Sequence, residues 1–158
     1  MSRLLLLALF VVIFTVGPGR AEAEWSDTNP PLNITHIFIG EINKRGKPVG
    51  LHVAPIETKN TSARIKEVLS GPNKAGVYTA LIEIFDPHTK RWKEKFSSFF
   101  PDRLSRQQVI DAILFAIRNN RLKPGAKWRG PSGHGFFIEG YHFKDGAVNT
   151  AYPLYVAD

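Results

Sequence analysis

Cysteine is absent from the 158-residue chain. Disulfides, cysteine nucleophiles and thiolate metal ligands are therefore excluded, and an exported form of the chain must be stable through packing alone. The five histidines do not fall at the spacings typical of helical or Cys/His metal sites. The chain also has no internal repeat and no low-complexity tract. The sequence therefore predicts neither a metal site nor a cofactor.

The N-terminus has the pattern of a secretory signal peptide. Arg3 gives a basic start, and Leu4–Val16 is an almost unbroken apolar run. Ala21-Glu22-Ala23 then provides the small-x-small pattern of a cleavage site. The apolar run is too short to span a bilayer comfortably. We therefore expect residues 1–23 to be removed from a secreted or periplasmic protein.

The chain is basic, with 21 lysines and arginines, 14 aspartates and glutamates and a formal net charge of +7. Loss of the first 23 residues would remove two arginines and one glutamate, and the mature chain would keep a net charge of +6. A basic surface attracts polyanions such as nucleic acid or acidic glycans. Composition alone does not separate such a surface from ordinary solubilising charge.

Strand and turn patterns alternate around a single predicted helix. A capping box at Ser105–Gln108 precedes apolar residues at helical spacing, which predicts an amphipathic helix over 106–119. A basic Gly/Pro-rich segment at 123–135 is predicted as a long loop, and the polar stretch 24–33 as a flexible lead-in. Strands are predicted at 34–39, 49–53, 63–69 (which also fits a short helix), 77–85, 91–100, 136–143 and 148–156. We therefore expect one α+β domain over 34–158, with mostly antiparallel twisted sheets and hairpins and one principal helix packed on them.

Two histidines lie on the two strands of the first predicted hairpin. His36 is in its first strand, and His52 is in its second, beyond turn residues at 43–46. Imidazole has an unperturbed pKa of about 6.5, so it both accepts and donates a proton near neutrality. Two such groups flanking a phosphodiester suffice for acid–base cleavage of RNA. A lone histidine between apolar strand residues is more often a core residue, whereas Gly50 beside His52 leaves room for a ligand.

Four short motifs follow one another along the chain: HIFIGEI, GLH, WKEKFSSFFP and VNTAYP. They contain the two histidines, two lysines and a terminal Thr-x-Tyr-Pro. In this order they resemble the EndoU endoribonuclease family, above all its bacterial branch, in which the domain occurs in toxins. Viral uridylate-specific endoribonucleases share the same outline. The resemblance extends from His36 to Pro153, although bacterial relatives often carry a second histidine where this chain has Val53.

The resemblance implies an acid–base pair of histidines, with the later histidine favoured as the base, and a catalytic lysine before the helix. Two lysines on one strand face fit this last role, and the second is preferred. A threonine would hydrogen-bond the uracil base, a tyrosine would pack on ribose or ring, and a serine hydroxyl would contact the base. The predicted catalytic residues are His36, His52 and Lys95, and the predicted substrate-binding residues are Thr150, Tyr152, Ser98 and Lys93.

These groups suit one reaction. In-line attack of an RNA 2′-hydroxyl needs a base for its proton, an acid for the leaving 5′-oxygen and a cation for the developing phosphorane charge. Two histidines and a lysine supply these roles without a metal; some relatives require manganese, which we do not infer for this chain. The product would be a 2′,3′-cyclic phosphate, and DNA would be spared. RNA is the expected substrate, and an immunity protein is a candidate partner.

Two other functions fit the same chain. A non-catalytic module would bind RNA or acidic glycans in a strongly salt-dependent manner without cleaving them. A ribonuclease-A-like toxin also uses two histidines and a lysine, but the pairing of GLH with TAYP fits the EndoU family better. Taken alone, a tyrosine such as Tyr152 is most often a half-buried packing residue.

Overall fold

The structure is a computed structural model that describes residues 23–55, 62–122 and 125–158. The predicted signal peptide lies almost wholly outside the described residues and stays a prediction. The elements are η1 (Thr35–Ile39), β1 (Glu41–Ile42), β2 (Pro48–Val49), β3 (Ala63–Ser70), β4 (Tyr78–Asp86), β5 (Arg91–Phe99), α1 (Arg106–Arg118), β6 (Lys127–Pro131), β7 (Phe137–His142) and β8 (Val148–Pro153).

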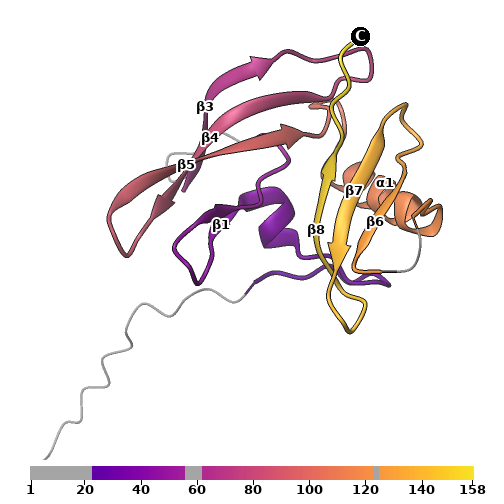
Figure 1. The fold of residues 1–158 in the computed structure, drawn as a ribbon, viewed down its shortest axis with the longest axis horizontal. Coiled ribbons are helices and arrows are strands. Elements are labelled where there is room, and N and C mark those ends of the chain that lie inside the picture. The colour runs from indigo at the N-terminus through magenta and orange to yellow at the C-terminus, as the bar shows by residue number, and fades with distance from the viewer. Residues whose placement is uncertain (1–22, 56–61, 123–124) are drawn as a thin grey trace, which may run out of the picture.

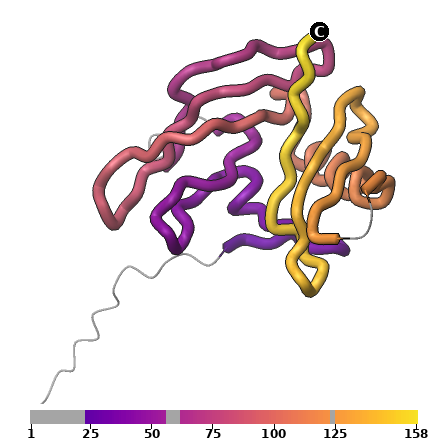
Figure 2. Tube along the Cα trace, in the orientation of Figure 1, coloured from indigo at the N-terminus to yellow at the C-terminus, as the bar shows by residue number. Residues whose placement is uncertain are grey.

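Two antiparallel three-stranded sheets form the frame (Figure 1), one in the order β3-β4-β5 and the other in the order β6-β7-β8. The β1-β2 hairpin contacts β4 and β5, whereas α1 packs on β6 and β7. In Figure 2 the last strand passes between the two halves, and β5 and β8 are in contact there. The predicted α+β class is confirmed.

Each sheet has its own hydrophobic core. One core joins α1 and the β6-β7-β8 sheet to η1, with Trp128, Ile113 and Ile37 fully buried. The other core lies under the β3-β4-β5 sheet and includes Ile82 and Leu51. The sheet junction therefore lies between two separately packed units.

The predicted helix is confirmed at α1. Ser105 accepts a hydrogen bond from the Gln108 backbone N–H, and the Gln108 side chain accepts one from the Ser105 backbone N–H, so the capping box is complete. The apolar face of α1 is buried against β6. No helix within the described ranges is both long enough and apolar enough to cross a membrane.

The strand predicted at 34–39 is wrong, because this segment forms η1, a single wide helical turn. Gly40 N–H donates to the Thr35 carbonyl five residues back (2.9 Å), and Gly40 at φ +75° ends the turn. Asn33 starts the turn, since its side-chain oxygen accepts from the His36 N–H (3.0 Å). The turn buries Ile37 in the first core, and this packing outweighs the strand propensity of a β-branched run.

A strand was also missed inside the loop predicted at 123–135, where β6 pairs with β7. Its glycine and proline suggested a loop, but both have a structural reason. A side chain on Gly130 would collide with the backbone of Ala116, so glycine lets α1 lie directly on the strand. Pro131 lies at the strand end.

The lead-in predicted at 24–33 is attached to the second sheet. Asn33 N–H donates to the Val148 carbonyl, and Val148 N–H donates to the Pro31 carbonyl, both at 2.9 Å. Leu32 is fully buried in the first core. The ordered unit therefore begins before residue 34.

Candidate active site

A cavity of about 720 Å³ lies at the junction of β5 and β8. Its lining combines η1, the segment after β2, strand β5 and strand β8, which are far apart in the sequence. Six of the seven predicted site residues line it: His36, His52, Lys95, Ser98, Thr150 and Tyr152. The seventh, Lys93, is not in its lining.

The two histidines are brought together by backbone hydrogen bonds between η1 and residues 51–52, and not by the predicted hairpin. Neither lies on a strand; instead, Leu51 N–H donates to the His36 carbonyl and His52 N–H donates to the Ile37 carbonyl, both at 2.8 Å. Gly50 and Leu51 adopt φ values of +73° and +62°. A side chain on Gly50 would collide with the His36 carbonyl. Glycine is therefore required here by the close approach of the His36 backbone, and not, as predicted, by the approach of a ligand.

His52 is held as one defined tautomer. Its Nδ1 lies 3.0 Å from the Ser98 carbonyl and 3.1 Å from Ser97 Oγ. The Ser97 hydroxyl donates to the Leu51 carbonyl at 2.5 Å, so its oxygen can only accept from the ring. Nδ1 therefore carries the proton, and Nε2 has a free lone pair. Burial, with a further contribution from nearby Lys95, lowers the pKa of His52 to about 3.

His36 is the other buried imidazole, and it has a carboxylate partner. Its Nδ1 lies 3.2 Å from Glu41 Oε1, and a carboxylate only accepts, so this nitrogen also carries a proton. Burial lowers the pKa of His36, while the hydrogen bond and the charge of Glu41 oppose that shift. Glu41 is the acidic position of the HIFIGEI motif. The two histidines thus differ, because only His36 has an anion beside it to stabilise its protonated form.

The two lysines of β5 have different surroundings. Lys95 Nζ donates to the Gly50 carbonyl (2.8 Å), and burial lowers its pKa to about 8. Lys93 Nζ binds Asp86 and the Gly46 carbonyl, both at 2.7 Å, beside the hairpin turn. The structure therefore brings Lys95 to the histidines and assigns Lys93 to the β1-β2 hairpin.

Strand β8 supplies the other wall through Thr150 and Tyr152, which are two residues apart and so share a face. The Tyr152 ring lies beside the His52 ring, with centroids 5.5 Å apart. Its hydroxyl donates to Glu139 Oε1 (2.6 Å), so the ring face is what it offers to a ligand. Burial alone would raise the pKa of Glu139, but hydrogen bonds from Lys127, Tyr152 and Arg129 hold it at about 2.

Sequence reasoning missed several supporting residues. Glu139 fixes Tyr152, Ser97 sets the His52 tautomer, and Asn149 accepts a hydrogen bond from Asn33 at 3.3 Å, which ties β8 to the start of η1. One signal was available, because Asn at the start of a buried turn is a common cap. The partners of Glu139 are brought together only by sheet pairing, and no local pattern contains them.

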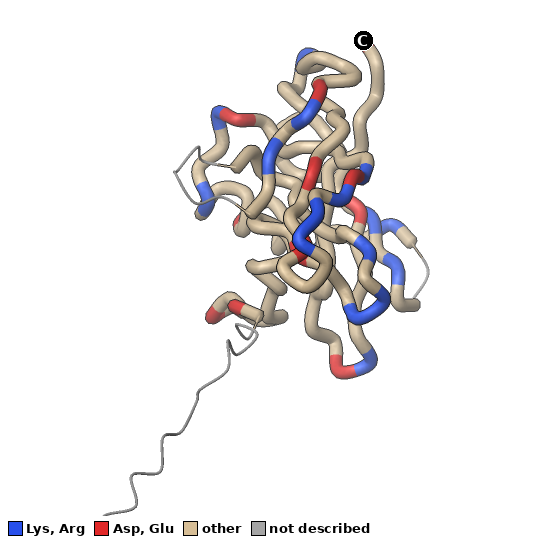
Figure 3. The backbone as a smooth tube through the Cα atoms, turned by 90° about the vertical axis from the view of Figure 1, so that its left-hand side faces the viewer, with Lys and Arg blue, Asp and Glu red and all other residues tan. Residues whose placement is uncertain are grey.

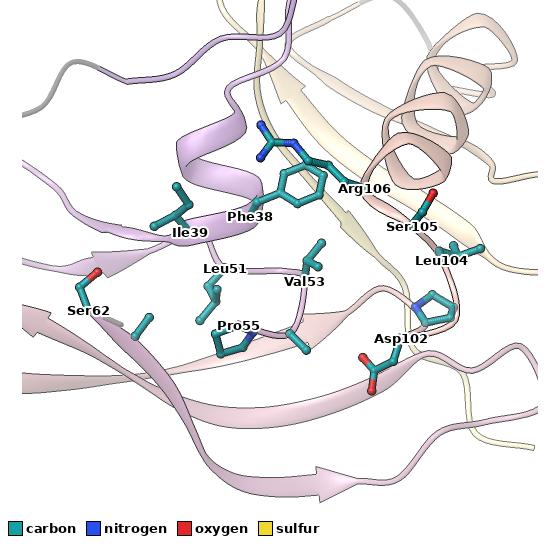
Figure 4. A pocket seen from close by; sticks show the side chains of 13 residues that line it. Phe38, Ile39, Leu51, Val53, Pro55, Ser62, Asp102, Leu104, Ser105 and Arg106 are labelled. Carbon is teal, nitrogen blue, oxygen red and sulfur yellow. The ribbon is translucent and has the colours of Figure 1, made fainter. Parts of the chain in front are cut away.

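A second cavity of about 700 Å³ lies on the other side of the 50–55 segment. Figure 4 shows Phe38, Leu51 and Val53 in its wall beside two charged residues. Both charged groups have partners: Asp102 accepts from the Tyr78 hydroxyl, and Arg106 lies over the Phe38 ring. Among the described residues no histidine or lysine lines it. The acid–base groups therefore belong to the first cavity alone.

Charged residues of both signs occur throughout the described chain. Figure 3 shows basic and acidic positions interspersed along the backbone. Within residues 23–55, 62–122 and 125–158, no group of three or more histidines and carboxylates is placed to hold a metal ion. We therefore define the site by its buried and partly buried titratable groups, which are His36, His52 and Lys95.

An exposed junction cavity that contains two histidines and a lysine is the arrangement expected of an acid–base nuclease. The model of the bacterial EndoU nuclease family matches residues 32–155, so the chain belongs to this family. A protein of Bacillus cereus named "Toxin" is 33% identical over 127 residues, which cover 78% of this chain and 22% of that protein. The chain thus spans about a fifth of the length of this relative. No solved structure matches.

Proposed function

We propose that this chain is an endoribonuclease that cleaves single-stranded RNA, preferentially at uridine, by acid–base transesterification. The observation that carries the proposal is the convergence of His36, His52 and Lys95 on one open cavity with Thr150 and Tyr152 opposite. Family membership supports nuclease chemistry. RNA rather than DNA is favoured because the proposed nucleophile is the 2′-hydroxyl of the substrate itself.

His52 is assigned as the general base. Its Nδ1 proton is held by the Ser98 carbonyl and Ser97, so its Nε2 lone pair is available to remove the 2′-hydroxyl proton. Its lowered pKa keeps the ring neutral in the resting protein at pH 7. A base that is already deprotonated suits the first proton transfer.

His36 is assigned as the general acid that protonates the leaving 5′-oxygen. Glu41 stabilises its protonated ring, and the negative phosphate of a bound substrate would raise the pKa of His36 further. Lys95 supplies the positive charge for the phosphorane. Its pKa of about 8 leaves most molecules protonated at pH 7. Proton transfer completes with a 2′,3′-cyclic phosphate and a free 5′-hydroxyl.

Uridine preference is assigned to β8. The Thr150 side chain would hydrogen-bond the uracil edge, and the Tyr152 ring, fixed by Glu139, would pack on ribose or base. Ser98 lines the same cavity, and we assign its hydroxyl to a contact with the uracil base. The Lys93 contacts leave it outside this set, so it has no proposed role in binding.

The setting of the activity is proposed from the N-terminal sequence and the relative. Residues 1–23 have the pattern of a signal peptide, so we infer a secreted or periplasmic enzyme. The Bacillus cereus relative is named as a toxin. A toxin role for this chain would require an immunity protein in the producing cell.

The test is cleavage of an oligoribonucleotide that contains one uridine among adenosines. Wild-type protein should cut at the uridine and leave a cyclic phosphate, and the same oligonucleotide with 2′-deoxyuridine should remain intact. His36→Ala and His52→Ala should each reduce the rate by about 10²–10⁴-fold. His88→Ala is a matched control, because His88 is an exposed turn residue outside the cavity.

Unchanged cleavage in both histidine variants would refute the mechanism. Salt-sensitive RNA binding without any product would replace it with the non-catalytic binding module. Cleavage that requires neither the uridine nor its 2′-hydroxyl would retain a nuclease but refute the assigned chemistry.

A further inference from the structure

A large aromatic side chain lies exposed at the edge of the proposed active site. Phe96 is 58% exposed and lines the cavity from β5. Lys95 and Ser97 face the hairpin, so Phe96 points to the opposite, outer face of the strand. Beside it on that face lies Leu81, its cross-strand partner. The proposed reaction gives this exposed ring no role.

Three residues with hydroxyl groups lie on the same outer face. Ser98 pairs with Thr79, and Thr79 pairs with Ser70, so the three side chains lie side by side across β5, β4 and β3. All three line the cavity, although Ser98 is only 8% and Thr79 only 5% exposed. Because Ser98 is already assigned to the uracil base, we refer to the other two residues, Thr79 and Ser70, as the hydroxyl row.

The hydroxyls of the row are unpaired but accessible. Within the described residues, neither the Thr79 hydroxyl nor the Ser70 hydroxyl has a hydrogen-bonding partner. The one sealed side-chain polar atom without a partner in the described chain is Trp128 Nε1, so the hydroxyl row is open to the cavity. Thr79 is more than nine-tenths buried, and a hydroxyl so buried that faces a cavity without a partner indicates a place for a polar ligand.

The tail after β8 also lines the part of the cavity that contains the hydroxyl row. Leu154 and Tyr155 line the cavity, and further on Asn73 Nδ2 donates to the Val156 carbonyl (2.8 Å). The Lys74 N–H then donates to the Asp158 carboxylate (2.9 Å). The tail is thereby held against the β3–β4 turn, and the cavity continues from the histidines along the hydroxyl row.

We propose that Phe96 and the hydroxyl row bind the nucleoside on the 3′ side of the scissile phosphate; this rests on the proposed endoribonuclease function. With uridine against β8 and the phosphate at the histidines, the leaving nucleoside faces β5. Its base stacks on Phe96, and its ribose and base edges hydrogen-bond the hydroxyl row, since hydroxyls both donate and accept. The row contains no cation, so it fits neutral groups rather than a second phosphate.

The experiment compares two substrates with the same uridine and the same type of alkoxide leaving group. UpA carries a 3′ nucleoside, and uridine 3′-methyl phosphate carries none. In Phe96→Ala the ratio of kcat/KM for UpA to that for the methyl ester should fall about tenfold, the size of one lost stacking contact. Thr79→Val, which replaces a hydroxyl by a methyl of similar shape, should lower the ratio several-fold. Phe96→Tyr keeps an aromatic ring, so it should keep the wild-type ratio.

Trp92→Ala is the matched control, because Trp92 lies on the same outer face of β5 but outside the cavity lining. An unchanged ratio in Phe96→Ala, or an equal fall in Trp92→Ala, would overturn the proposed subsite. In the first case the exposed ring would be a protein-contact residue instead. If wild-type protein cleaves neither substrate, the proposed function fails separately, and equilibrium binding of UpA decides the subsite: equal affinity of wild type and Phe96→Ala overturns it.

Discussion

Acid should destabilise this protein through one residue in particular, because His52 is buried in its neutral form. Its pKa is about 3 in the folded protein and 6.5 in the unfolded chain. Between these values the unfolded chain binds the extra proton, so stability falls as pH falls through 6.5 and levels off below pH 3. From pH 7 to pH 5 this linkage removes about 2 kcal/mol of unfolding free energy.

Between pH 7 and pH 5 the change in stability comes mainly from the histidines and not from the carboxylates. Glu139, with a pKa lowered to about 2, loses its stabilising contribution mainly below pH 4.5. Burial also lowers the pKa of His36, so His36 adds to the loss of stability as the pH falls. Lys95 stays charged throughout this range and opposes protonation of His52.

Urea denaturation at pH 7, 6 and 5 measures the effect in wild type and His52→Asn, whose amide can still donate to the Ser98 carbonyl. The variant has its own stability at pH 7, so the slope with pH is what is compared. It should lose about 2 kcal/mol less than wild type between pH 7 and pH 5. His88→Asn, a change at an exposed turn position, should keep the wild-type slope. Equal slopes in wild type and His52→Asn would refute the assignment of a neutral, buried imidazole.

Three further outcomes are expected. Gly50→Ala should destabilise the protein by about 3 kcal/mol, since it combines a positive φ with a backbone collision, whereas Gly71→Ala, which meets nothing within 4 Å, should change thermal unfolding little. The kcat/KM for a uridine dinucleotide should decline above about pH 8, because Lys95 loses its proton there. Lys95→Arg stays charged, so it should move that decline to higher pH. The same decline in both proteins would exclude Lys95 as the group that titrates. Tyr152→Phe should stay within a few-fold of wild-type activity because the ring remains, while Tyr152→Ala should lose at least about tenfold; equal losses would assign the function to the hydroxyl.

Sequence motifs located the candidate site better than they described its local structure. The order of His36, His52, Lys95 and Tyr152 was enough to select residues that share one cavity. The conformation around His36 was nevertheless missed, because a β-branched run has strand propensity whichever core buries it. The helical turn there depends on Asn33 as a cap and on Ile37 packing into a core assembled from distant elements.

Alternation along a strand also failed to distinguish the two lysines. Lys93 and Lys95 share a face of β5, as predicted. Their partners differ because Asp86, the last residue of the neighbouring strand β4, binds Lys93. Asp86 pairs directly with Arg91 in the sheet register, a relation that only the β4–β5 turn determines. The dependence of Tyr152 on Glu139 follows from the β7–β8 register in the same way. Local patterns therefore identify reactive groups, and sheet register decides which of them are free to react.

His52 links the two halves of the molecule as well as the two halves of the proposed reaction. Its N–H donates to η1, which packs in the first core, while its carbonyl accepts from Phe100 N–H (2.8 Å) and its ring is bonded to Ser98 of β5. His36 and Tyr152 are on the side of β8, and Lys95 is on the β5 side. Protonation of His52 therefore charges a largely buried group at the junction of two separately packed units. Acid should loosen the same junction that aligns the acid–base pair, so the loss of catalytic geometry and the loss of stability should begin in the same pH range.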